Sequence, residues 1–332
     1  MLDSHLKICM NVNASFPSPG ILSDGGIRRE IRNGNIRISE FEDSQIQPSS
    51  LDLRIGKVKI LSRDEREFPD EQGIPIDLPS KSISEIYFHE NIFTNFPKRL
   101  DLRSSRGRLG LEIIANNKDS ILVVNNNPNT IRLYGRTPFA QMIFHSYIDI
   151  DGYVVNGQEE AERIGKALGI PTLGPYALFQ LGEHAYRFKH VGTIDTKKPC
   201  EDNYEKLSTA NLKVPINETF VCQLAPRIDL PADIGIQVLH KIPFLQESGH
   251  IKPNPAHFLV EGSVCNAGWV DPGYKGNITA HIRRLKLPGT YQKGDDLALG
   301  VFFKYYQPVE RPYGHQDTNN HYSGSAGSTS RS

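Results

Sequence analysis

The stretch Ile278-Thr-Ala-His-Ile282 alternates apolar and polar side chains, and this alternation decides the fold class. In a strand, successive side chains point to opposite faces, so the two isoleucines share one face with Ala280, while Thr279 and His281 share the other. The pattern predicts a strand with one face in a core and the other toward a pocket. Short apolar or alternating runs separated by Pro, Gly and Asn recur at 51–60, 121–124, 131–133, 139–144, 220–224, 234–239 and 297–305. This texture is typical of a β-sandwich or barrel.

Two segments carry helical signals instead. Residues 24–34 have Ser23 or Asp24 as an N-cap, apolar residues at helical spacing and Gly34 just past the end. Residues 158–168 are followed by Gly169 and Pro171, which predicts that a second helix stops there, in a place suited to a domain connector.

The chain has 332 residues, about two domains by the usual size range, and its halves show a weak internal likeness. Residues 139–144 parallel 297–303, and the segments 186–189 and 192–195 replay the early strand. The likeness favours a tandem duplication over a fortuitous match. We expect an N-terminal extension at 1–19, one unit at 20–150, a second at 151–310, and a polar, flexible C-terminal lid at 311–332.

Charge and hydropathy exclude several classes of protein. The formal net charge is zero, so nothing global attracts this chain to nucleic acid or to an anionic membrane. The longest apolar runs are far shorter than the roughly 20 residues of a membrane helix. The N-terminal ten residues include His5 and Lys7 and no convincing cleavage site, so we expect a cytoplasmic protein.

The four cysteines lie far apart, at Cys9, Cys200, Cys222 and Cys265, with no Cys-x-x-Cys pair. Their spacing argues against a disulfide framework and a structural zinc site. A zinc-dependent deaminase needs a Pro-Cys-x-x-Cys segment, and Cys200 after Pro199 lacks the second cysteine. We therefore expect no metal bound by the protein's own side chains.

Two segments carry candidate chemistry. The first, Arg103-Ser-Ser-Arg-Gly-Arg-Leu-Gly-Leu111, crowds hydroxyls and guanidinium groups together, and the planar fork of arginine suits phosphate oxygens. The second, Asn266-Ala-Gly-Trp-Val-Asp-Pro-Gly-Tyr-Lys-Gly276, places Asp271 and an aromatic residue on a tight turn. The bland alternatives are a solvated surface loop for the first and an ordinary Asp-Pro-Gly turn for the second.

Both segments resemble signatures of the dCTP deaminase and dUTPase superfamily, Arg-Ser-Ser-x-x-Arg-Leu-Gly and Ala-Gly-x-x-Asp-Pro-Gly-x-x-Gly. The segments 20–31, 45–56 and 310–314 are similar to the beginning and to the C-terminal lid of these deaminases. The resemblance implies an all-β fold of tandem dUTPase-like distorted β-barrel or jelly-roll domains with a few short helices. It further implies hydrolytic deamination of dCTP to dUTP and ammonia.

The resemblance also assigns site residues. Catalytic roles fall to Ser104, Arg108 and His281, and substrate-binding roles to Arg103, Ser105, Ala267, Trp269, Asp271, Tyr274 and Tyr322. The aspartate and the tyrosine of the turn would hold the deoxyribose, and a ring packed on C2′ would exclude ribonucleotides. The tail would cover the triphosphate, although Ser325 stands where the family usually has Gln, and Tyr322 is also explained as an aromatic residue in a disordered tail.

The chain departs from the family at the general base. The family has Glu in an Ile-Thr-Leu-Glu stretch, and this chain has His281 at that position. A histidine can act as a base near neutral pH, but a structural strand histidine is the alternative reading. Glu112 and Glu261 are further candidates.

The resemblance agrees with the cysteine spacing in implying no zinc. Two further expectations come from the resemblance alone: Mg²⁺ bound through the substrate triphosphate, and a homotrimer or its tandem equivalent. Two other functions stay open at this point. One is a dUTP pyrophosphatase, alone or combined with deamination, in which Asp271 activates water. The other is a nucleotide-binding protein without catalysis.

Overall fold

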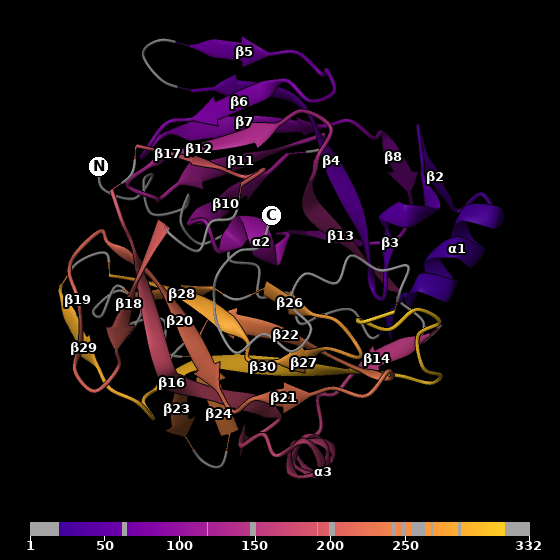
Figure 1. Cartoon of the computed structure of the whole chain (residues 1–332). Helices are drawn as coiled ribbons and strands as arrows, with labels where there is room; N and C mark the ends of the chain where they lie inside the picture. The colour runs from indigo at the N-terminus through magenta and orange to yellow at the C-terminus, as the bar shows by residue number, and fades with distance from the viewer. Residues whose placement is uncertain are drawn as a thin grey trace, which may run out of the picture.

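The computed structural model describes residues 20–61, 65–117, 119–146, 151–190, 192–198, 203–240, 244–247, 250–253, 263–266, 268–284 and 287–315. These residues form two stacked β-rich bodies, one from each half of the chain (Figure 1). The short helix α2 (Ser104–Gly107) lies between the two bodies. The predicted all-β class with few short helices is confirmed.

The first half is built around a row of antiparallel strands, each hydrogen-bonded to the next. In spatial order they are β9 (Lys98–Leu102), β13 (Pro138–Ser146), β4 (Ser50–Ile60), β7 (Ile83–Phe88), β11 (Ser120–Asn125) and β10 (Leu111–Asn116). The row is completed by β1 (Gly20–Ile21) on β13, β3 (Ile46–Gln47) and β5 (Arg66–Phe68) on β4, and the pairs β2–β8 (Ile36–Ile38, Ile92–Thr94) and β6–β12 (Pro75–Leu78, Thr130–Tyr134).

The second half repeats this row. Its strands, in the same spatial order, are β22 (Ile234–His240), β30 (Asp296–Tyr305), β16 (Tyr176–Phe188), β20 (Thr219–Ala225), β28 (Thr279–Arg284) and β25 (Ser263–Asn266). The row of the second half also has additional strands: β14 (Gly152–Val154) pairs with β30, and β15 (Thr172–Leu173) and β18 (Tyr204–Ser208) pair with β16. Strands β19 (Leu212–Val214) and β29 (Gly289–Tyr291) pair with each other. The shared order confirms the tandem fold, while the predicted domain boundaries stay a prediction.

Single residues at equivalent positions of the two halves also correspond. Gly56 and Gly182 occupy the same place in β4 and β16, and both strands shift register directly beside them, at Ile55/Val58 and Leu181/Ala185. A Cβ at Gly56 would lie 2.8 Å from the Phe88 backbone, and one at Gly182 would lie 3.0 Å from a backbone oxygen of β20. Each glycine therefore lets the neighbouring strand approach closely.

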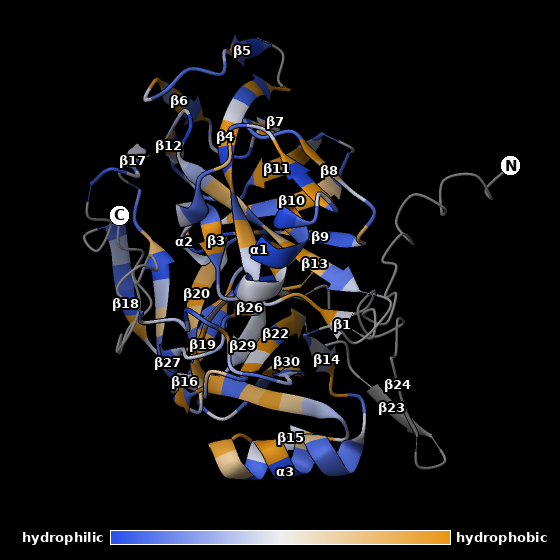
Figure 2. Cartoon of the chain, turned by 90° about the vertical axis from the view of Figure 1, so that its right-hand side faces the viewer, coloured by the Kyte–Doolittle hydropathy of each residue, from blue (hydrophilic) through white to orange (hydrophobic). Residues whose placement is uncertain are grey.

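Both predicted helices are present. Helix α1 (Asp24–Arg32) has Ser23 as its N-cap, whose hydroxyl accepts from the Gly26 N–H, and Gly34 follows with a φ of 76°. Helix α3 (Gln158–Leu168) ends at Gly169 in the left-handed conformation. Figure 2 shows α3 beneath β15 and β16, with α1 largely hydrophilic. The remaining elements are the 3-10 turn Asp43–Gln45, β17 (Thr193–Asp195), β21 (Ile228–Asp229), β23 (Phe244–Glu247), β24 (His250–Pro253), β26 (Gly268–Val270) and β27 (Lys275–Gly276).

The halves are joined as well as stacked. Strand β1 pairs with both β13 and β14, and β17 of the second half pairs in parallel with β12 of the first. The segment 192–195 therefore does not replay the early strand as the sequence suggested, since Thr193–Asp195 crosses over to extend the first half's sheet. A hydrophobic cluster with Ile21, Ile143, Trp269 and Phe303 spans the two halves.

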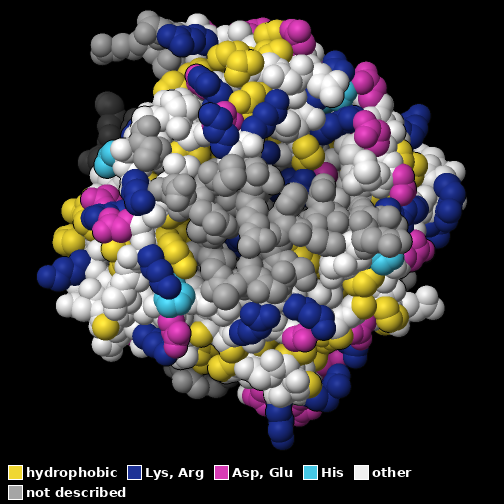
Figure 3. Space-filling view, viewed as in Figure 1, with side chains coloured by type: hydrophobic (Ala, Val, Ile, Leu, Met, Phe, Trp, Pro, Cys, Tyr) yellow, Lys and Arg dark blue, Asp and Glu magenta, His cyan; other side chains and the backbone are white. Residues whose placement is uncertain are grey.

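The described surface mixes charges of both signs. On the face in Figure 3, Lys and Arg side chains are interspersed with Asp and Glu. Within the described residues no helix is both long and apolar enough to cross a membrane.

Candidate functional site

The serine-arginine loop continues directly from β9. Arg103 precedes α2, its N–H donates to the Phe139 oxygen, and the Arg108 N–H donates to the Ser104 oxygen at 3.0 Å, which closes one helical turn. Ser104 is exposed, while Arg108 is buried. Helix α2 packs against β26, the strand that leads into the Asp-Pro-Gly turn of the second half. The two segments singled out in the sequence therefore meet.

The Asp-Pro-Gly turn is held from both halves. The Tyr274 N–H donates to the Asp271 oxygen at 3.2 Å, which closes the turn, and Gly273 has a φ of 85°. The Asp271 carboxylate accepts from the Ser49 hydroxyl at 2.6 Å and from the Trp269 indole N–H at 3.1 Å, both on Oδ1. Burial raises the pKa of Asp271 to about 6, although both hydrogen bonds favour the charged form.

A second buried carboxylate lies beside it. Asp52 on β4 forms an ion pair with Arg103, with Oδ2 and Nη1 2.9 Å apart. Burial raises the pKa of Asp52 to about 6; the Arg103 charge opposes this rise, and the Asp271 and Glu90 charges add to it. The positive charge of Arg103 also lowers the pKa of Asp271. One guanidinium from the first half thus interacts with carboxylates from both halves. This charged centre is the electrostatic core of the candidate site.

His281 lies on the same side of the interface. A Cβ on Gly107 of α2 would lie 3.9 Å from its ring, and the backbone of Arg108 hydrogen-bonds to it. Burial and the positive charges of Arg108 and Arg283 lower the pKa of His281 to about 4. The imidazole is therefore neutral at neutral pH, which makes it a weak base.

A carboxylate also reaches this strand from the first half. Glu112 Oε2 accepts from Arg283 Nη2 at 3.0 Å and from Asn126 Nδ2 at 2.9 Å. Arg283 is two residues from His281 on β28, so their side chains share one face of the strand. Glu112 thus places a carboxylate on the side where α2 and β28 meet.

The start of the C-terminal segment packs over the Asp-Pro-Gly turn. The Tyr313 N–H donates to the Pro272 oxygen, and its ring lies edge-on to that of Tyr274, with centroids 5.4 Å apart. Two residues that precede Tyr313 in the chain, Glu310 and Arg311, donate their N–H groups to the buried carboxylate of Asp24, each at 2.9 Å. Helix α1 and the turn therefore fix residues 310–313 beside the site.

The predicted site residues fall into three groups. Arg103, Ser104, Ser105 and Arg108 lie on or beside α2, and Trp269, Asp271 and His281 face them from the second half. Tyr274 is buried in the second half's core, with its hydroxyl on the Asn277 backbone oxygen and its ring edge-on to that of Tyr313, and its contact with a sugar stays a prediction. Ala267, Tyr322, Ser325 and Glu261 lie outside the described residues.

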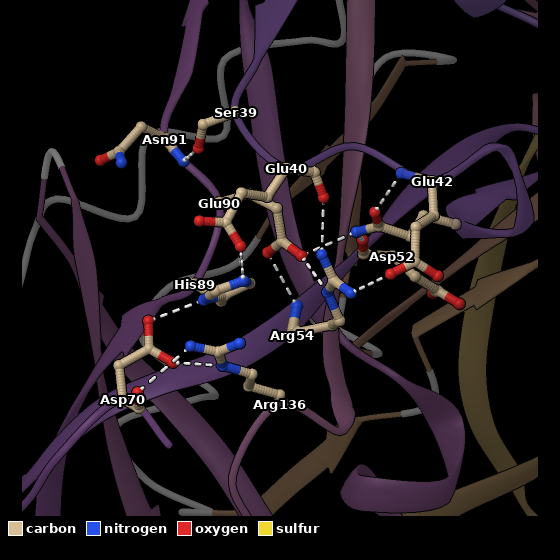
Figure 4. Close-up of polar contacts among 11 residues, drawn as sticks. Ser39, Glu40, Glu42, Asp52, Arg54, Asp70, His89, Glu90, Asn91 and Arg136 are labelled. Carbon is tan, nitrogen blue, oxygen red and sulfur yellow. Dashed lines mark hydrogen bonds and ion pairs between the residues drawn. The ribbon is translucent and has the colours of Figure 1, made fainter. Parts of the chain in front are cut away.

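Sequence reasoning missed Ser49 and Asp52. Behind Asp52, Glu90 accepts from Arg54 Nε at 2.6 Å (Figure 4). Gln45 Nε2 donates to Glu90 at 2.8 Å and also to the backbone oxygen of Asp52. The same network holds His89 between Asp70 and Glu40, at 2.7 and 2.6 Å. The signal available was the polar alternation Asp52, Arg54 within an apolar strand, which is unusual for residues of a core.

Comparison with known proteins points in one direction. Residues 21–95 match the family model described as dCTP deaminase-like. The chain is 40% identical over 62 residues to a "dCTP deaminase, dUMP-forming" of Methanosphaera stadtmanae, covering 18% of this chain and 32% of that protein. It is 28% identical over 151 residues to a dCTP deaminase of Ignicoccus hospitalis, covering 37% of this chain and 82% of that protein. The chain thus spans about a third of the length of the first curated relatives it matches.

The fold extends the likeness to both halves. The crystal structure of 2'-deoxycytidine 5'-triphosphate deaminase from Agrobacterium tumefaciens matches with a TM-score of 0.68 at 16% sequence identity. The match covers 86% of this chain and 99% of that chain. The tandem arrangement of the two halves is therefore that of a known deaminase structure.

Proposed function

We propose that this protein is a dCTP deaminase that converts dCTP and water to dUTP and ammonia in one composite site per chain. The observation that carries the proposal is the convergence of the serine-arginine loop and the Asp-Pro-Gly turn on the charged centre of Asp52, Arg103 and Asp271. Similarity of the first half and the fold of both halves to dCTP deaminases support it.

The proposed roles come from the family resemblance. Water adds to C4 of cytosine while a proton passes from it to the amino group, which leaves as ammonia. Ser104 and Arg108, on and beside α2, would position this water and polarise the base. Asp271 has both its hydrogen bonds on Oδ1, which leaves Oδ2 to accept from a sugar hydroxyl.

The proton carrier is proposed to be Glu112 or His281. A neutral imidazole whose pKa is about 4 takes up a proton poorly at neutral pH. Glu112 is a carboxylate whose hydrogen bonds to Arg283 and Asn126 both fall on Oε2. Comparing Glu112→Gln with His281→Gln separates the two, because only the variant lacking the proton carrier loses kcat without a matching loss of dCTP affinity.

We extend the proposal to the phosphates and to the assembly. Mg²⁺ would arrive bound to the triphosphate. Arg103 and Ser105 would contact the nucleotide, with Tyr322 of the tail over it. Trimeric assembly, a cytoplasmic location and independence of zinc are parts of the same proposal.

The test is direct. Purified protein is incubated with dCTP and Mg²⁺, and ammonia, pyrophosphate, dUTP and dUMP are followed together. We expect ammonia to form, and Ser104→Ala to lower kcat by about 100-fold or more. The control is Ser208→Ala, which removes another exposed serine hydroxyl in the second half and leaves turnover unchanged.

Each rival function has its own signature in this assay. Pyrophosphate from dUTP without ammonia from dCTP would identify a pyrophosphatase, whereas ammonia with dUMP would identify the combined reaction named for the Methanosphaera relative. Tight dCTP binding without any product would identify a catalytically silent binder. Full turnover in Ser104→Ala would remove the proposed role of α2.

A further inference from the structure

Ser49 lies in the turn between β3 and β4 of the first half, yet its hydroxyl is bonded entirely to the second half. It donates to Asp271 Oδ1 at 2.6 Å and accepts from Trp269 Nε1 at 2.6 Å. The same indole N–H also reaches Asp271 Oδ1 at 3.1 Å, so the three side chains close a triangle. Ser49 has no exposed surface and Trp269 is buried, while Asp271 is half-buried.

Both sides of the triangle are held rigidly. The Pro48 oxygen accepts from the Asp24 N–H at 2.9 Å, and Gln47 pairs with Ser50, so the backbone on either side of Ser49 is fixed. Trp269 pairs with Gln237 in β22, and its ring packs against Phe303 with centroids 4.7 Å apart. With its hydrogen directed at Asp271, the hydroxyl satisfies both Asp271 and Trp269, and the buried Tyr305 hydroxyl is a third group that interacts with it.

We propose that Ser49 is a positioning residue of the composite site, which holds the Asp271 carboxylate in the orientation that meets the substrate and couples it to the first half. The catalytic part of this inference rests on the proposed function. In a buried site, a fixed hydroxyl replaces the water that would otherwise solvate the carboxylate and lets it turn. Oδ1 is thereby committed to the protein and Oδ2 to a ligand.

Several charged and titratable groups face the Asp271 carboxylate. Arg103 favours its charged form, while Asp24 and Asp52 oppose it, and the buried Tyr305 hydroxyl lies close enough to interact with it. Burial is the largest influence and raises the pKa, whereas the Ser49 hydrogen bond lowers it. Removing the hydroxyl therefore moves the titration of Asp271 to higher pH.

The chain supplies its own reporter for this test. Trp269 is the only tryptophan in the sequence, and its indole N–H contacts the carboxylate, so intrinsic fluorescence follows the ionisation of Asp271 without any substrate. Fluorescence is titrated from pH 4 to pH 8 in the full-length wild type, Ser49→Ala, Ser50→Ala and Asp271→Asn. Ser50→Ala is the matched control, because it removes a neighbouring buried hydroxyl that makes no hydrogen bond to the triangle.

We expect a wild-type midpoint near pH 6, a midpoint higher by roughly one pH unit in Ser49→Ala, no change in Ser50→Ala, and no such transition in Asp271→Asn. In the deamination assay, Ser49→Ala should raise the KM for dCTP about 10-fold with a smaller change in kcat. A Ser49→Ala midpoint equal to that of Ser50→Ala overturns the proposal, as does a transition that survives in Asp271→Asn. If the wild type neither binds nor deaminates dCTP, the proposed function fails, and the fluorescence comparison still decides whether Ser49 controls Asp271.

Discussion

The two halves of this molecule share one order of strands but present different chemistry on the same face of it. In the first half, Asp52 on β4, Gln141 on β13 and Asp101 on β9 lie directly beside one another across the sheet. In the second half the equivalent positions on β16, β30 and β22 are Leu178, Leu299 and Leu239. A duplicated fold therefore keeps its backbone pairing, while only the first copy has polar side chains at these three positions.

The charged network behind Asp52 follows the same rule. The His89 N–H donates to the Arg54 oxygen at the end of β7, and Gln180 pairs with Ala225 at the equivalent place in the second half. Glu90 follows His89 in the first half, and Pro226 follows Ala225 in the second. An ion pair between Arg54 and Glu90 lies at this place in the first half, whereas Gln180 of the second half makes a hydrogen bond to Asp296.

The largest effect is expected from replacing Asp52 of the first half by the residue at the equivalent position of the second half. Asp52→Leu copies the second half's residue and leaves Arg103 without its partner, so deamination should fall at least about 100-fold and the free energy of unfolding by about 3–5 kcal/mol. Asp52→Asn, which keeps the shape, should lose activity with a smaller loss of stability. Steady-state kinetics and urea denaturation measure both.

The reciprocal change, Leu178→Asp, is the control for that exchange. It should leave calorimetric dCTP binding at one nucleotide per chain, because the second half lacks the other polar residues of the row. A second nucleotide bound by the wild type would contradict a single composite site.

Breaking the supporting network should cost stability in one half only. Arg54→Gln installs the residue of the second half and leaves the fully buried Glu90 side chain without its cation, for an expected loss of about 3–5 kcal/mol. Gln180→Ala, which removes a hydrogen bond to Asp296, should cost less than about 1 kcal/mol. If Arg54→Gln and Gln180→Ala lowered the free energy of unfolding equally in urea denaturation, the ion-pair network would not stabilise the first half more than the single hydrogen bond stabilises the second.

The charged centre should also give the protein an unusual pH dependence. The pKa values of Asp52 and Asp271 in the fold are about 6, above the roughly 3.9 of an unfolded chain, so between pH 4 and pH 6 the fold holds protons that the unfolded chain has released. Their contribution to stability is full below pH 4 and is lost as pH rises through 6, by roughly 2–4 kcal/mol. Urea denaturation from pH 5 to pH 7.5 should show this fall, and the double variant Asp52→Asn with Asp271→Asn should flatten it.

A loss of moderate size should be shared by both halves. Gly56→Ala and Gly182→Ala each place a methyl group against the neighbouring strand, at 2.8 and 3.0 Å from backbone atoms, so each should lower the free energy of unfolding by about 1–3 kcal/mol. The closer contact at Gly56 predicts the larger loss. A neutral result at either glycine would mean that the register shift beside it is not under the same constraint in the two halves.

Most of the fold was predictable from local pattern. Alternation placed β28, a capping serine and a terminal glycine placed α1, and Gly169 ended α3, because these signals act within a few residues of where they stand. The segment 192–195 was misplaced because its pairing with β12 is a contact between halves, which no local signal encodes. The motif residues on α2 and the Asp-Pro-Gly turn were recognised, and their catalytic roles stay predictions.

The amino-acid sequence by itself determined the class of fold, both helices and the two segments of the candidate site, since periodicity, capping and turn preferences are properties of neighbouring residues. Only the tertiary structure decided that those segments meet, that Ser49 and Asp52 join them, and that His281 stays neutral. The physical reason is that burial and long-range pairing set the pKa of a side chain and determine the partner of a hydroxyl, and both depend on residues far away in the chain, as Ser49 and Asp271 do at a separation of 222 positions.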